Sequence, residues 1–133
     1  MREILLDTNA VIALSDPTHR LFKLIEEVLV QGGRASVCVI AWHEYMRGPL
    51  TMEDRERAIN VIESRIITLD RSCAEFAAKL YNQTGRRRGS TADCLIASVA
   101  IRHNLELVTW NHEDFERFVP MGLSLADIGV GPN

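Results

Sequence analysis

Four side chains that could bind a cation stand at separated places in the chain: Asp7, Glu44, Asp93 and Asn111. Asp7 ends a short apolar run that is typical of a buried strand, and Glu44 lies one helical turn beyond a second such run. Several carboxylates share a site away from water only when a positive charge neutralises them. If these residues meet in the fold, the sequence predicts a site for a divalent cation.

The residue types favour Mg²⁺ or Mn²⁺ over Zn²⁺. Zinc is typically held by cysteine pairs or histidines, and this chain has neither at ligand spacing. Mg²⁺ keeps several waters and takes one or two protein carboxylates, which leaves coordination positions for a phosphate. A cation bound in this way lowers the pKa of a water and stabilises the charge that develops on a phosphoester. The chemistry indicated is metal-assisted phosphoester hydrolysis.

Alternating strand and helix patterns bring the four residues to one edge of a sheet. Short apolar runs predict strands at 2–6, 35–41, 66–69, 105–109 and 123–125. Amphipathic patterns and capping residues predict helices at 17–30, 42–47, 51–62, 74–81, 90–103 and 111–118. Such alternation is typical of an α/β fold with a mostly parallel sheet of four to five strands, flanked by helices on both faces. Ligands of such sheets bind at the carboxyl ends of the strands.

Composition indicates one domain over residues 1–133 in a reducing compartment. The chain has 47% hydrophobic and 25% charged residues, and its 18 acidic and 15 basic side chains give a net charge of −3. Three cysteines without a C-x-x-C pair favour buried thiols over a disulfide framework. The opening apolar run is cut off by Asp7, and no run approaches the roughly 18 apolar residues of a membrane span. We therefore expect a cytoplasmic protein without membrane contact.

The densest positive cluster is the loop of Arg86, Arg87 and Arg88, which leads into Asp93. Because the net charge is acidic, any nucleic-acid contact must be local, and this loop is the candidate for contacting phosphate. The alternative is a solvated charged loop. For Trp110 as well, two interpretations stay open: packing, or stacking on a substrate base.

Taken together, the residues resemble PIN-domain ribonucleases, and most closely the VapC-type toxins of bacterial and archaeal toxin-antitoxin pairs. The resemblance rests on four segments in the same order: Asp7-Thr8-Asn9, Glu44, Thr91-Ala92-Asp93, and the stretch 107–115. Each segment alone is a weak signal, but four in the right order on the right elements are fairly specific. The resemblance covers essentially the whole chain.

This resemblance implies an endoribonuclease that depends on Mg²⁺ or Mn²⁺, in which Asp7, Glu44 and Asp93 hold the metal. Asn111 stands at a fourth position that is often Asp in the family, so the number of metal ions, one or two, stays open. Asp114 could supply the missing charge, although we interpret it rather as a cap of the last helix.

The resemblance also implies supporting residues and partners. Thr8, Asn9 and Thr109 would orient the carboxylates by hydrogen bonds. The partners would be an RNA substrate, a protein antitoxin and a second copy of the chain in a homodimer. The alternative function is a PIN-like binding module with weak or no catalysis, which metal-dependent RNA cleavage would distinguish.

Overall fold

Five parallel strands form the centre of the fold in a computed structural model that describes residues 1–129. The strands are β1 (Glu3–Leu6), β2 (Arg34–Cys38), β3 (Ile66–Ile67), β4 (Glu106–Val108) and β5 (Ser124–Leu125). Their order is β3-β2-β1-β4-β5. In this register, Leu5 of β1 lies between Ser36 of β2 and Leu107 of β4. The predicted parallel α/β sheet is confirmed.

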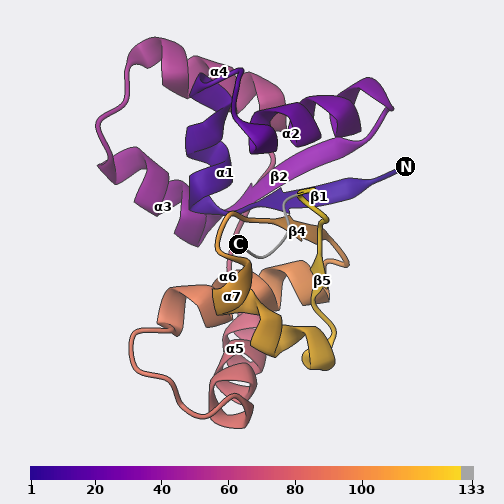
Figure 1. Cartoon of the computed structure of the whole chain (residues 1–133). Coiled ribbons are helices and arrows are strands. Elements are labelled where there is room, and N and C mark those ends of the chain that lie inside the picture. The colour runs from indigo at the N-terminus through magenta and orange to yellow at the C-terminus, as the bar shows by residue number, and fades with distance from the viewer. Residues whose placement is uncertain (130–133) are drawn as a thin grey trace.

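Helices cover both faces of this sheet. They are α1 (Thr8–Ile12), α2 (Arg20–Val30), α3 (Val39–Arg47), α4 (Met52–Ile62), α5 (Arg71–Gln83), α6 (Thr91–Arg102) and α7 (His112–Phe115), with 3-10 helices η1 (Ala13–Ser15) and η2 (Glu116–Met121). In Figure 1, α1 to α4 lie above the sheet and α5 to α7 below it. The last three residues of β1, Ile4, Leu5 and Leu6, are fully buried as a result, as expected of a strand covered on both faces.

Helix α6 is largely buried. Its residues Ile96 to Ala100 are all buried, and the Ser98 hydroxyl donates to the backbone oxygen of Cys73 in α5 at 2.7 Å. Small residues such as Ala97 allow this close packing of α6 against its neighbours. The packing fixes the N-terminus of α6, and with it Asp93, at the edge of the sheet.

Some predicted boundaries are wrong. The apolar run 35–41 is not one strand, because β2 ends at Cys38 and α3 begins at Val39, three residues before the predicted start at Trp42. A short apolar run does not distinguish a buried strand from the buried start of a helix. Likewise, α5 begins at Arg71 because the Asp70 carboxylate accepts the backbone N–H of Cys73 at 2.8 Å.

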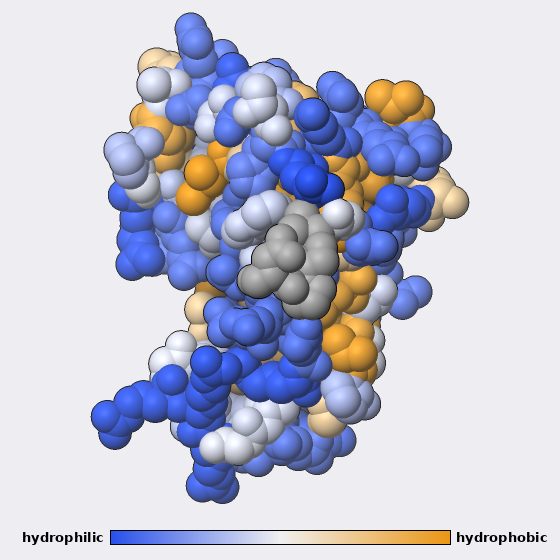
Figure 2. All heavy atoms as spheres, viewed as in Figure 1, coloured by the Kyte–Doolittle hydropathy of each residue, from blue (hydrophilic) through white to orange (hydrophobic). Residues whose placement is uncertain are grey.

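The described surface is mainly polar. Figure 2 shows hydrophilic residues over most of the visible face, with apolar patches scattered between them. Within residues 1–129, no helix is long and apolar enough to cross a membrane. Cys38, Cys73 and Cys94 are buried free thiols, as predicted.

Candidate active site

Asp7 lies at the carboxyl end of β1 and is buried, with 6% of its surface exposed. Its backbone N–H donates to the oxygen of Val108 at 3.0 Å, which continues the pairing of β1 with β4. One carboxylate oxygen accepts the Thr8 backbone N–H at 2.8 Å, and the other accepts the Thr109 hydroxyl at 2.7 Å. These two contacts hold the carboxylate in a single orientation between the two strands.

Glu44 joins Asp7 through Thr8. The Thr8 hydroxyl donates to Oε1 of Glu44 at 2.7 Å, so one residue of α1 contacts both carboxylates, Asp7 with its backbone N–H and Glu44 with its side chain. Glu44 is half-buried in α3. The structure therefore brings Thr8 and Thr109 to the carboxylates that they were expected to orient.

Asn9 lies differently from the expectation. Its side-chain oxygen accepts the backbone N–H of Trp110 at 3.0 Å rather than contacting a carboxylate. Asn9 therefore ties α1 to the loop between β4 and α7.

Asp93 lies in the first turn of α6 and is half-buried. The pKa of its carboxyl is raised to about 6, first by burial and then by the negative charges of Asp7 and Asp114, while Arg117 opposes the shift. The pKa of Asp7 is also raised, mainly by burial, with a contribution from Glu44 and Asp114, although its bonds from Thr109 and Thr8 lower it. Asp7, Glu44, Asp93 and Asp114 therefore act on one another electrostatically, and we call them the acidic cluster.

Asp114 is the fourth charged member of the acidic cluster, and Asn111 lies beside it without a charge. Asn111 is exposed, and its backbone N–H donates to the Thr109 hydroxyl oxygen at 3.0 Å. The interpretation of Asp114 as a helix cap is wrong, because Asn111 holds the N-cap position of α7 and Asp114 lies inside that helix. The charge missing at position 111 is thus present one helical turn further on.

Two arginines approach the acidic cluster. Arg86, Arg87 and Arg88 are all exposed, and Nη2 of Arg87 lies 3.6 Å from Oδ1 of Asp114, so one arginine of this loop reaches the site. Nη2 of Arg117 lies 3.9 Å from Oδ2 of Asp93, and the side chain is 17% exposed.

Sequence reasoning missed Arg117. Its Nη1 donates to the backbone oxygen of Asp114, and its guanidinium lies 4.4 Å from the ring centroid of Phe118. The spacing of three residues from Asp114 was the only signal in the sequence, and it is shared by many surface arginines.

The acidic cluster fits a cation that keeps some of its waters better than a metal that is fully enclosed by protein ligands. Among residues 1–129, no three His, Cys, Asp or Glu side chains converge closely enough to form a ready-made metal site. Mg²⁺ needs no such cage, because it keeps waters and uses one or two carboxylates. Burial first, and then the neighbouring carboxylates, raise the pKa of Asp7 and Asp93, so a bound cation would stabilise their charged forms. An oxygen-only donor set with excess negative charge fits Mg²⁺ or Mn²⁺.

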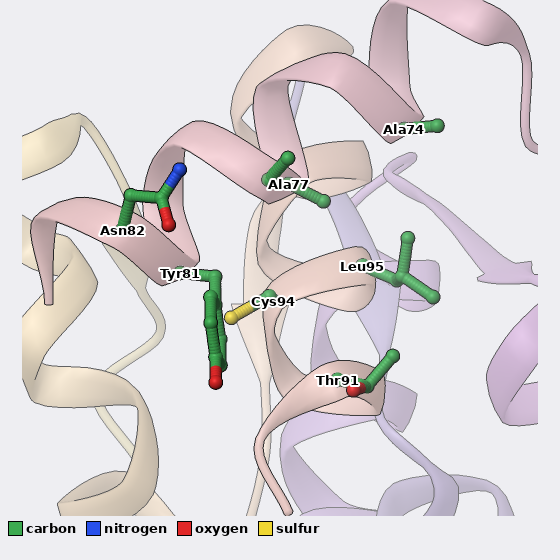
Figure 3. Close-up of a pocket in the computed structure, with 8 residues that line it drawn as sticks. Ala74, Ala77, Tyr81, Asn82, Thr91, Cys94 and Leu95 are labelled. Carbon is green, nitrogen blue, oxygen red and sulfur yellow. The ribbon is translucent and has the colours of Figure 1, made fainter. Parts of the chain in front are cut away.

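A separate hollow of about 300 Å³ lies between α5 and α6. Figure 3 shows that it is lined mainly by apolar side chains, with the ring of Tyr81 beside the sulfur of Cys94. No carboxylate lines this hollow, although Thr91 at its margin is only two residues from Asp93. The chemistry predicted from the sequence therefore belongs to the acidic cluster and not to this hollow.

Comparison with known proteins gives the family that the sequence motifs resemble. The model of the PIN domain matches residues 4–119. Ribonuclease VapC1 of Methanocaldococcus jannaschii is 30% identical over 130 residues, which cover 94% of this chain and 88% of that protein. The chain therefore belongs to the PIN-domain family, in its VapC branch.

Solved structures agree in fold. The structure of VapBC-1 from nontypeable Haemophilus influenzae matches with a TM-score of 0.68 at 26% identity, over 96% of this chain and 99% of that chain. VapBC2 from Rickettsia felis, bound to a DNA fragment from the promoter of its genes, matches with a TM-score of 0.69 at 24% identity, over 93% and 97% of the two chains. At that identity, the second likeness concerns the fold alone.

Proposed function

We propose that this chain, as one domain over residues 1–133, is a Mg²⁺- or Mn²⁺-dependent endoribonuclease that hydrolyses phosphodiester bonds of RNA. The observation that carries the proposal is the acidic cluster, in which burial and then the neighbouring carboxylates raise the pKa of Asp93 to about 6. A relative along nearly the whole chain is named a ribonuclease, which supports the same activity.

In this mechanism Asp7, Glu44 and Asp93 hold the cation. The cation, when bound, supplies an activated water and stabilises charge on the phosphate. Thr109 and Thr8 keep Asp7 oriented through their bonds to its two oxygens.

The remaining polar residues support this reaction. Asp114 adds a fourth negative charge to the site, and Asn111 could offer a neutral amide oxygen. Arg86, Arg87 and Arg88 bind phosphates of the RNA strand without reading its sequence.

The test of the activity is cleavage of an unstructured RNA by the purified chain. We expect cleavage with Mg²⁺ or Mn²⁺ and none in excess EDTA, with activity restored when the metal is added back. The matched control is Asp7→Asn purified in the same way, which should be inactive with either metal. Full cleavage in EDTA by the wild-type chain would disprove metal dependence, and equal cleavage by the variant would indicate a contaminating nuclease.

We also propose that the chain is a cytoplasmic toxin that forms a homodimer and pairs with a protein antitoxin. The names of similar structures, which describe VapBC complexes, support such a partner. Expression of this chain alone should arrest growth, and co-expression of the protein encoded beside it should relieve the arrest. Harmless expression of active protein at a high level would contradict the toxin role. Light scattering of the purified chain would test the homodimer.

The alternative is a binding module with little or no catalysis. Asn111 favours this alternative, because its side chain is neutral and exposed and adds no charge to the cation site. RNA binding without cleavage in either metal, by a chain whose fold is confirmed by circular dichroism, would establish the alternative.

A further inference from the structure

Trp110 is an exposed aromatic residue next to the acidic cluster. It has 44% of its surface exposed, and it is the one aromatic among the large hydrophobic residues found exposed in the described part of the chain. It directly follows Thr109, whose hydroxyl donates to Asp7 at 2.7 Å. Consecutive Cα atoms are about 3.8 Å apart, so the indole begins one residue from the proposed cation site. The exposed part of this side chain is available to a ligand.

Two contacts position Trp110, one through its backbone and one through its indole. The backbone N–H of Trp110 donates to the Asn9 side chain at 3.0 Å, and the His19 ring meets the indole at 4.9 Å between centroids with an interplanar angle of 66°. His19 is itself held, because its Nδ1 accepts the backbone N–H of Leu21 at 3.0 Å. A T-shaped contact of this kind occupies at most one face of the indole. The ring is therefore ordered before a ligand arrives, which lowers the entropy cost of binding.

We propose that Trp110 is a stacking platform for an unpaired base of the RNA, beside the phosphate that is cleaved. The proposal rests on the ribonuclease function and deepens it, because it names a side chain that contacts the substrate. An aromatic face binds bases of any sequence by stacking. A base inside a duplex is already stacked and paired, so the platform selects single-stranded segments or loops. The affinity of Trp110 for RNA then depends more on whether the base is unpaired than on which base it is.

The first test uses the fluorescence of Trp110 itself. The chain has two tryptophans, so Trp42→Phe leaves Trp110 as the only one. This variant is titrated with a single-stranded oligoribonucleotide in Ca²⁺, which suppresses cleavage, and then with the blunt duplex of the same sequence. We expect saturable quenching by the single strand and little by the duplex. The matched control, Trp110→Phe, retains Trp42 and should show little quenching with either ligand.

The second test separates stacking from other roles. Trp110→Ala should raise KM and the dissociation constant for single-stranded RNA by about tenfold, with kcat nearly unchanged, because stacking stabilises ground and transition states alike. Trp110→Phe should restore most of the affinity. Val119→Ala removes another exposed apolar side chain and should leave both constants unchanged.

The outcomes distinguish this proposal from the proposed function. Quenching by single-stranded RNA without any cleavage would keep the platform and overturn the ribonuclease function. Normal cleavage with no quenching, and an unchanged KM in Trp110→Ala, would overturn the platform. Equal quenching by the duplex would also overturn it, because the indole would then contact RNA without stacking on an unpaired base. If Trp110 serves a protein partner instead, its replacement by alanine would weaken that complex and leave RNA affinity unchanged, which again rejects the platform.

Discussion

The two sides of the acidic cluster are held in different ways. On one side, Asp7 and Glu44 accept hydrogen bonds of 2.7 Å from threonine hydroxyls. On the other side, Asp93 and Asp114 face arginine nitrogens at 3.9 and 3.6 Å, distances too long for hydrogen bonds.

The threonine hydroxyls orient their carboxylates, whereas the arginines partly neutralise theirs. A hydroxyl donor fixes a carboxylate and leaves its full charge available to a cation. An arginine offsets the charge of a carboxylate, and at these distances it does so without fixing the oxygen positions. We infer that the Asp7 side is preorganised and that the Asp93 side adjusts when a cation binds.

Loss of a charge on either side should have the largest effect. Asp7→Asn and Asp93→Asn should each lower the RNA cleavage rate by on the order of a hundredfold or more, the effect of removing a group that stabilises transition-state charge. Both variants should keep the fold, and isothermal titration should show weaker binding of Mn²⁺. The control is Glu113→Gln, an exposed acid beside Asp114, which should cleave normally. Wild-type cleavage by Asp93→Asn would remove that residue from the site.

Removing a threonine hydroxyl from the Asp7 side should weaken metal binding and activity. Thr109→Val keeps the shape of a fully buried side chain but removes the bond to Asp7. We expect a loss of about 10- to 100-fold in metal affinity or activity, as for other residues that support a metal ligand. The exposed Thr68→Val is the control. An equal effect of both substitutions would show that the hydroxyl of Thr109 does not orient Asp7.

The metal-free protein should become more stable as the pH falls from 7 to about 5. The pKa of Asp93 is about 6 in the fold against an ordinary value of 3.8 for an aspartate, so the folded state takes up a proton before the unfolded chain does. Folding is therefore favoured at lower pH, by about 1 kcal/mol between pH 7 and 5 for this group. Urea unfolding in EDTA measures the effect. In Asp93→Asn the dependence should be weaker and the stability at pH 7 higher; an unchanged profile would show that Asp93 does not titrate in this range.

Substitution of the basic loop should change RNA affinity and leave the cation site nearly intact. Replacing Arg86, Arg87 and Arg88 with alanine should weaken RNA binding uniformly across sequences and reduce its salt slope by up to about two, for three phosphate contacts to a single strand. Titrations in Ca²⁺ at several salt concentrations measure the slope. Arg55→Ala, an exposed arginine of α4, is the control. If the slope of the triple variant equals that of wild type, the loop is only solvated.

The smallest effect is expected at position 111. Asn111→Asp adds a negative charge near the cation and should tighten metal binding slightly, because the residue is exposed and its charge is screened by solvent. Asp114→Asn is the informative counterpart, since Asp114 already raises the pKa of both Asp7 and Asp93. A larger effect at position 111 than at 114 would restore Asn111 as the fourth ligand position.

Much of the architecture follows from local pattern. The runs around Leu5, Val37 and Leu107 predicted buried parallel strands, and polar residues directly after a strand marked the edge where a ligand binds. Thr8 and Thr109 could be anticipated as partners of the carboxylates because they adjoin the ends of β1 and β4. Such inferences succeed because strand and helix periodicities are properties of neighbouring residues.

Local sequence patterns were enough to predict the alternation of strands and helices, the acidic edge of the sheet and the family. The tertiary packing determines that Asp114 acts on Asp7 and Asp93, that Arg117 faces Asp93, and that Asn9 holds the loop of Trp110. The physical reason is that the direction of a side chain depends on how its helix is rotated and packed against elements far away in the sequence. Asn9 and Trp110 are 101 residues apart, and no local pattern encodes the distance between them.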